Sequence, residues 1–181
     1  PTLVVAVGAG LKLPAETLRR VRRALDRKDE GAVAKVLGDA KKATEMFVGL
    51  LRAAGPAEKG IAKLTALKLP PAAAAEATRL ADAVKLVRAA DQDLPLTLDP
   101  VEYRGLEYQT GVSFSVFALK GRHELARGGR YSAGYPEDGV SEPATGFTLY
   151  MDSVLQASEA PAPVSAAAPL PVCAVRLCDA S

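Results

Sequence analysis

The 181-residue sequence predicts an α+β fold in which a helical region precedes an antiparallel sheet. Two observations carry this prediction. Apolar residues recur at helical spacing from about residue 14 to residue 91, and from residue 94 they alternate with polar residues as in strands. The composition agrees, with 49% hydrophobic, 24% charged and only 5% aromatic residues. We therefore expect one ordinary domain with a core built mainly from Ala, Leu and Val.

Composition also excludes several classes of protein. A net charge of +2 argues against a dedicated nucleic-acid surface. Two cysteines and one histidine suit neither a disulfide framework nor a structural zinc site. No apolar run reaches the roughly 20 residues of a membrane span, and no secretory leader pattern opens the chain. We expect a cytoplasmic protein without a cofactor and, from the abrupt start at Pro1 and stop at Ser181, a fragment of a larger domain.

The first residues are predicted to form a strand and a turn. Residues 3–7 are a short apolar run of the kind that forms a buried strand. Gly8 and Gly10 follow it, but position 13 is leucine where a dinucleotide-binding loop would need a third glycine. Turn glycines are therefore the favoured interpretation.

The next region predicts a small bundle of short antiparallel helices. A first helix begins near Pro14, because proline suits a first turn. Residues 33–37 suggest a short second helix, and residues 46–51 form a third apolar stripe that Gly55 and Pro56 close. Two prolines at 70 and 71 open a longer, alanine-rich helix.

The first of these helices carries a group of arginines. Acidic residues interrupt the group, and the apolar stripe occupies another face of the helix. A solvated helix face is favoured over a phosphate-binding surface. The arginines are Arg19, Arg20, Arg22, Arg23 and Arg27.

Strands are predicted for the second half of the chain. Residues 94–98 and 107–119 alternate in polarity, with Val112, Phe114 and Val116 on one face of the longer strand. Gly121 supports a hairpin turn into a strand at 124–130. A further strand at 143–151 leads into a short helix at 152–157.

Three segments follow from these patterns. Residues 1–157 form one partial domain, with helices at about 14–91 and the sheet at about 94–157. Residues 158–170 are rich in Ala, Pro and Ser and are expected to be a linker. Residues 171–181 begin a further strand or a tail.

Two polar segments in the sheet region are candidates for a binding site. Residues 103–111 combine an arginine, a carboxylate, an amide and phenols, and residues 126–131 place adjacent glycines beside Arg130 and Tyr131. Such groups bind a small zwitterion through its ammonium and carboxylate. An ordinary hairpin with polar edges fits the residues equally well. Glu107 and Tyr108 fall on opposite faces of an ideal strand, so both reach one ligand only where the strand bends or bulges.

Three ordered motifs resemble those of histidyl-tRNA synthetases. Residues 104–111 (Arg-Gly-Leu-Glu-Tyr-Gln-Thr-Gly) are similar to the first histidine-recognition motif, and residues 128–131 (Gly-Gly-Arg-Tyr) to the second. Residues 143–152 fall where motif 3 of class II synthetases is expected. The resemblance covers residues 16–157. It implies a class II aminoacyl-tRNA synthetase-like antiparallel sheet with a helical insertion.

Departures from the synthetase pattern point to one branch of this family. Asp152 and Ser153 stand where motif 3 has a Glu-Arg pair that clamps ATP, and a serine cannot supply a cationic fork. Tyr150 replaces a glycine, and Gln109 replaces a tyrosine of the first motif. With these changes the sequence resembles the regulatory subunits of ATP phosphoribosyltransferase, which are synthetase paralogues without aminoacylation activity. A histidyl-tRNA synthetase fragment and a stand-alone amino-acid-binding module are the alternatives.

The resemblance implies a non-catalytic role in the first step of histidine biosynthesis. The expected partner is the short-form catalytic subunit of ATP phosphoribosyltransferase, a glycosyltransferase, and the expected assembly is a homodimer within a hetero-oligomer. L-Histidine is the implied ligand and feedback inhibitor, with no catalytic residue and no metal in this chain. The implied histidine-binding residues are Arg104, Glu107, Tyr108, Gln109, Gly128, Gly129 and Tyr131.

Overall fold

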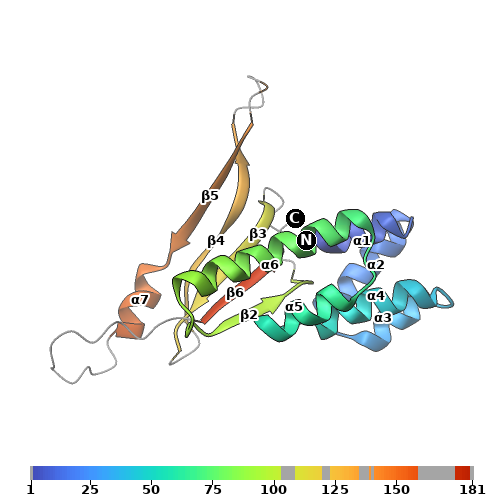
Figure 1. The fold of residues 1–181 in the computed structure, drawn as a ribbon, viewed down its shortest axis with the longest axis horizontal. Coiled ribbons are helices and arrows are strands. Elements are labelled where there is room, and N and C mark those ends of the chain that lie inside the picture. Colours follow the sequence, from blue (N-terminus) through green and yellow to red (C-terminus); the bar gives the residue numbers. More distant parts are fainter. Residues whose placement is uncertain are drawn as a thin grey trace.

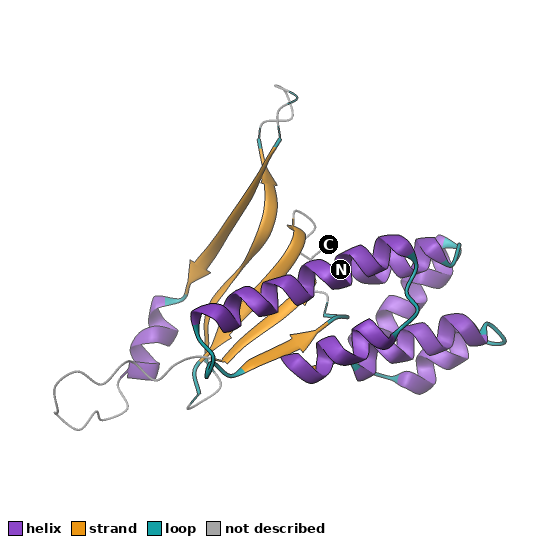
Figure 2. Cartoon of the chain, in the orientation of Figure 1, coloured by secondary structure: helices purple, strands orange, loops and turns teal. Residues whose placement is uncertain are grey.

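The structure, a computed structural model, describes residues 2–102, 109–119, 123–134, 139, 141–158 and 174–179. Residue 109 and residues 174–179 are described by their backbone alone. A group of helices packs beside a twisted sheet, and the strands β4 and β5 extend away from the helices (Figures 1 and 2). The predicted α+β class is therefore confirmed.

The helical region is confirmed, and its apolar stripes form the core. Val21 and Leu25, Phe47 and Leu50, and Leu80 are buried on the inner faces of three different helices. One helix, α5, was not predicted separately. The helices are α1 (Thr2–Gly10), α2 (Ala15–Asp26), α3 (Glu30–Leu37), α4 (Lys41–Arg52), α5 (Ala57–Ala66) and α6 (Pro71–Ala90).

The predicted strand at residues 3–7 is wrong, because this segment lies in α1. Leu3, Val4 and Val7 fall on one helical face and are buried, and α1 packs against α6 (Figure 1). The predicted turn at Gly8 and Gly10 is wrong as well, since both glycines lie inside the helix. A Cβ on Gly8 would lie 2.7 Å from a methyl carbon of Leu18, so glycine permits α1 to approach the next helix closely.

The sheet confirms the strands that were predicted after residue 94, with somewhat different ends. Its described strands run in the order β1-β2-β6-β3-β4-β5, and every neighbouring pair is antiparallel except β2 with β6. The predicted short helix follows β5 as α7 (Met151–Ser158). Most of the predicted linker, residues 159–170, lies outside the described residues. The strands are β1 (Gly55–Pro56), β2 (Leu96–Asp99), β3 (Gln109–Phe117), β4 (Glu124–Ala133), β5 (Glu142–Leu149) and β6 (Ala174–Asp179).

The hydrophobic core lies between the helices and one face of the sheet. Leu96 and Leu98 of β2 are buried in the same cluster as the helical residues, and Val112 and Phe114 of β3 pack against that cluster. Helix α6 crosses this face of the sheet (Figure 1). The predicted core-facing side of the long strand is thus confirmed at Val112 and Phe114.

One ion pair joins the helices to the sheet. Lys28, in the turn between α2 and α3, places its ammonium nitrogen 2.8 Å from a carboxylate oxygen of Asp99 at the end of β2. Asp99 is buried, and its carboxylate also accepts a hydrogen bond from the backbone N–H of Val101. A buried carboxylate needs such partners to stay charged, so the turn and the strand end are held together.

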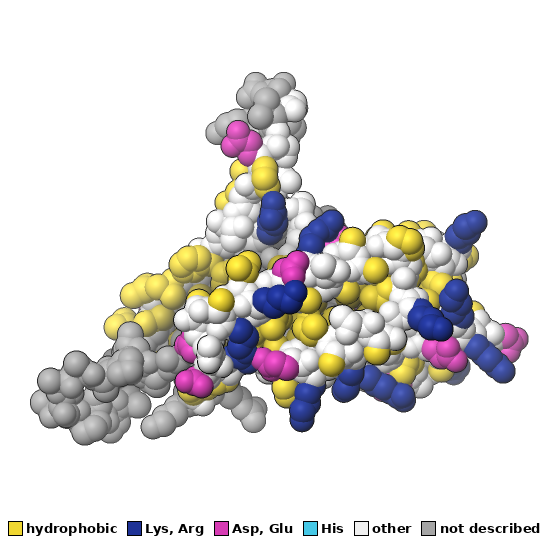
Figure 3. Space-filling view, viewed as in Figure 1, with side chains coloured by type: hydrophobic (Ala, Val, Ile, Leu, Met, Phe, Trp, Pro, Cys, Tyr) yellow, Lys and Arg dark blue, Asp and Glu magenta, His cyan; other side chains and the backbone are white. Residues whose placement is uncertain are grey.

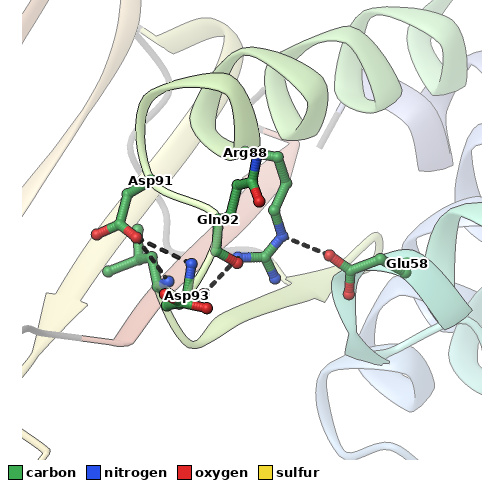
Figure 4. Close-up of polar contacts among 6 residues, drawn as sticks. Glu58, Arg88, Asp91, Gln92 and Asp93 are labelled. Carbon is green, nitrogen blue, oxygen red and sulfur yellow. Dashed lines mark hydrogen bonds and ion pairs between the residues drawn. The ribbon is translucent and has the colours of Figure 1, made fainter.

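A second polar junction connects α6 to β2 (Figure 4). Arg88 of α6 donates to Glu58 of α5 and to the carbonyl oxygens of Gln92 and Leu94. The hydrogen bond that the Arg88 guanidinium donates to Glu58 is the main cause that lowers the pKa of Glu58. Asp91 accepts hydrogen bonds from two backbone N–H groups just after it, which shapes the turn into the strand.

Apolar side chains are exposed along the outer strand and the helix after it. Phe147 is 68% exposed, and Leu149, Met151 and Leu155 are about half exposed. Figure 3 shows hydrophobic side chains gathered over β5 and α7. We call these four residues the β5–α7 strip. No helix in the described part of the chain is long and apolar enough to cross a membrane.

Candidate functional site

The structure describes part of the predicted histidine-binding set. Arg104, Glu107 and Tyr108 lie outside the described residues. Gln109 is described by its backbone, at the start of β3. The remaining predicted residues lie together in the middle of β4, which pairs with β3 on one side and β5 on the other. These are Gly128, Gly129 and Tyr131.

Gly128 lies beneath an aromatic pair. Its strand partners are Phe114 of β3 and Phe147 of β5, whose ring centroids are 6.4 Å apart. A Cβ on Gly128 would lie 2.7 Å from the ring of Phe114 and 2.5 Å from the Cβ of Phe147. The space above Gly128 is therefore filled by side chains of the protein itself.

The opposite face of β4 carries Gly129 and Tyr131, because successive residues of a strand alternate in direction. The backbone register places Tyr131 opposite Gln109, and Gly129 opposite Ser113. The Tyr131 ring extends over β5, since a Cβ on Gly146 would lie 3.5 Å from the Tyr131 hydroxyl. Three of the predicted residues, Gln109, Gly129 and Tyr131, thus lie in two adjacent strands.

Two irregularities interrupt the pairing of β3 with β4. In the first, the three residues 110–112 of β3 lie opposite the single residue Arg130. The side-chain alternation of an ideal strand therefore does not hold along residues 110–112. In the second, Leu125 is an extra residue in β4, between the pairs formed by Glu124 and Ala126.

The second irregularity adds two charged residues to the polar face. Glu124 pairs with Phe117 and Arg127 with Ser115, and residues 115 and 117 share a face of β3. Arg127 donates two hydrogen bonds to the Glu124 carboxylate, at 3.0 and 2.6 Å. Simple alternation places residues 124 and 127 on opposite faces, so the sequence pattern missed this pair.

The polar face therefore offers several hydrogen-bonding groups to a small polar molecule. It carries the Arg127–Glu124 pair, the hydroxyl of Ser113 and the phenol of Tyr131, whereas Ser115 on the same face is buried. These groups bind and orient a ligand through hydrogen bonds and charge. Within the described residues, no group of three or more His, Cys, Asp or Glu side chains is placed to hold a metal ion.

The segment predicted as motif 3 lies at the junction of β5 and α7. The backbone N–H of Tyr150 donates to the carbonyl of Leu125, and its carbonyl accepts from the N–H of Val154. Asp152 and Ser153 lie in the first turn of α7. The backbone at Tyr150 is therefore anchored to β4, three residues before Ser153, which was predicted to occupy the arginine position of motif 3.

Comparison with known proteins identifies the family. The family model described as histidyl-tRNA synthetase matches residues 1–154. The chain belongs to the histidyl-tRNA synthetase family. Its sheet and helices are consistent with a fragment of the class II synthetase-like domain, so the predicted fold type is confirmed.

Within the histidyl-tRNA synthetase family, the chain is similar to proteins named ATP phosphoribosyltransferase regulatory subunit. It is 52% identical to the one from Paramagnetospirillum magneticum over 90% of this chain and 41% of that protein. It is 49% identical to the one from Rhodospirillum centenum, over 90% of this chain and 40% of that protein. It is 40% identical to the one from Rhodospirillum rubrum, over 90% of this chain and 41% of that protein. The chain thus spans about two fifths of these curated relatives, and the predicted resemblance to this branch is confirmed.

Proposed function

We propose that this chain is part of a regulatory subunit of ATP phosphoribosyltransferase. The carrying observation is the 52% identity over 90% of the chain to a protein of that name. The subunit acts with a separate short-form catalytic subunit, which it activates and places under feedback control by histidine. It forms a homodimer within a cytoplasmic hetero-oligomer and carries no catalytic residue of its own.

The arrangement at α7 supports a regulatory role over aminoacylation. A synthetase needs a fixed cation to hold the triphosphate of ATP, and arginine serves because its planar fork matches phosphate oxygens. Ser153 is uncharged, and it lies in the first turn of α7 behind the anchored backbone of Tyr150. The segment that matches motif 3 therefore lacks the group on which ATP activation depends.

Reconstitution of the full-length protein with a short-form catalytic subunit tests this function. We expect the two to elute together in size-exclusion chromatography, turnover to rise on mixing, and histidine to inhibit the complex. Separate elution with unchanged turnover would contradict the proposal. Histidine-dependent exchange between ATP and pyrophosphate by the protein alone would favour the synthetase. Histidine binding with no partner dependence would favour a stand-alone binding module.

We further propose that histidine binds on the polar face of β3 and β4. Gly129 has no side chain, and Tyr131, two residues along the same strand face, supplies a phenol. Gln109 starts the neighbouring strand opposite Tyr131. Arg104, Glu107 and Tyr108 precede Gln109 in the chain and complete the set by resemblance to the first histidine motif. Gly128 acts indirectly, by admitting the Phe114 and Phe147 side chains on the other face.

Arg104→Ala is expected to weaken histidine binding by the full-length protein about 10- to 150-fold. The reason is that loss of a hydrogen bond to a charged group costs about 1.5–3 kcal/mol. Isothermal titration calorimetry with L-histidine measures the change. The matched control is Arg79→Ala, which removes an exposed arginine of α6 that pairs with Glu76. Equal affinity in the Arg104 variant and the wild type would place the histidine site elsewhere.

A further inference from the structure

A groove lined by arginines lies between α2 and α3. It has a volume of about 290 Å³. Its floor is formed by small apolar side chains, and its rim by long cationic ones. The floor residues are Ala24, Ala32 and Val36, and the rim residues are Arg20, Arg23 and Arg27.

The rim arginines share one side of α2. Spacings of three and seven residues place Arg20, Arg23 and Arg27 on one helical face, away from the core residues Val21 and Leu25. All three arginine side chains are exposed. Their guanidinium groups are thus presented to whatever approaches the groove.

Three cations near the groove have acidic partners, unlike the rim arginines. Arg19 pairs with Glu16, Lys28 with Asp99, and Arg52 with Glu30. Among the described residues, no carboxylate lies within ion-pair distance of the rim arginines. Their charges are therefore available for a partner outside the described part of the chain.

The charge of the chain is concentrated around this groove. Residues 15–38 contain seven Lys and Arg against four Asp and Glu, a net charge of +3, whereas the whole chain carries +2. The remainder of the sequence is thus close to neutral. An acidic partner is attracted to this end of the helical region in preference to the rest of the surface.

We propose that the groove binds an acidic segment of a partner protein. Each guanidinium can donate two parallel hydrogen bonds to one carboxylate, and arginine is enriched in protein–protein interfaces. The floor of alanine and valine has room for a small apolar side chain between the carboxylates. Under the proposed function, on which this step rests, the partner is the catalytic subunit.

The groove suits an acidic protein better than RNA. Single-stranded RNA is held by aromatic side chains that stack on bases, and none of the residues that line the groove is aromatic. Three arginines around an apolar floor also provide fewer phosphate contacts than a nucleic-acid surface uses. An apolar floor is of use to a protein partner, which can bury side chains on it.

Charge reversal in the full-length protein tests the groove. We expect the triple variant R20E/R23E/R27E to bind the catalytic subunit on the order of 100-fold more weakly, because interface arginines are frequent hot spots. The control is K42E/K59E/K68E, which makes the same change of net charge at exposed lysines of α4, of α5 and of the segment after α5. It is expected to bind as the wild type does. Surface plasmon resonance at two salt concentrations measures both variants.

The outcomes separate this proposal from the proposed function. If the wild type fails to bind the catalytic subunit, both are overturned. If the wild type and the triple variant bind equally, the groove assignment alone is overturned. Retention of tRNA by the wild type and not by the triple variant would overturn it in favour of RNA. A lower melting temperature of the uncomplexed triple variant would overturn it in favour of carboxylates from the same polypeptide.

Discussion

Gly128→Ala is expected to destabilise the full-length protein by about 3 kcal/mol or more, at the upper end of the usual cost of overpacking. The new methyl group would lie 2.5 Å from the Cβ of Phe147 and 2.7 Å from the ring of Phe114. It would also meet the backbone carbonyl of Gly146, which the pairing of β4 with β5 holds in place. Because backbone cannot yield as a side chain can, the strands must separate. Urea denaturation followed by circular dichroism measures the loss.

Gly49→Ala provides the matched control. The three atoms nearest to a Cβ at Gly49 of α4 all belong to the flexible end of the Leu67 side chain, the first at 2.6 Å. Alanine is also favoured over glycine inside a helix by about 1 kcal/mol, which offsets part of that contact. We expect the free energy of unfolding of Gly49→Ala to differ from that of the wild type by no more than about 1 kcal/mol. Similar denaturation midpoints for the Gly128 and Gly49 variants would show that the aromatic pair over β4 is not tightly packed.

Phe47→Ala is expected to cost about 3–5 kcal/mol, the usual range for removing a buried aromatic ring. Phe47 is completely buried in α4 and belongs to the cluster shared by the helices and β2. The substitution leaves a cavity that the surrounding helices fill only in part. Urea denaturation of the full-length protein gives the free energy of unfolding.

Leu86→Ala is the control for Phe47→Ala. Leu86 lies on the outer side of α6 and is 73% exposed, so its truncation leaves no internal cavity. Exposed substitutions usually change stability by no more than about 0.5 kcal/mol. A loss for Phe47→Ala no larger than that for Leu86→Ala would contradict the position of the core between helices and sheet.

The sequence predicted those elements whose pattern is both long and regular. Helix α6 has a proline at its start and apolar residues at helical spacing through Val84, and it forms as expected. The segment of α1 was mistaken for a strand because a run of five apolar residues suits a buried helix and a buried strand equally. The position of β6 between β2 and β3 depends on pairing between distant parts of the chain, which local pattern does not contain.

The candidate site was predictable in composition but not in geometry. The order of the motifs indicated the family and brought Gly129 and Tyr131 into consideration. The inclusion of Arg127 and Glu124 depends on one extra residue at Leu125, and a bulge changes the direction of side chains without a distinctive sequence. Likewise, Gly128 is compatible with close approach of a ligand or of a phenylalanine, and only the packing distinguishes the two.

The β5–α7 strip has a consequence for how this chain behaves in solution. β5 is the outermost described strand on its side of the sheet, and it presents Phe147 and Leu149 to solvent. A strand with unpaired backbone on one side and apolar side chains is a template for a second strand. When this chain is produced by itself, we expect β5 strands of different molecules to pair, so that aggregation increases with protein concentration. Lysine substitutions on β5 are the natural means to suppress it, since charged edges resist edge-to-edge pairing.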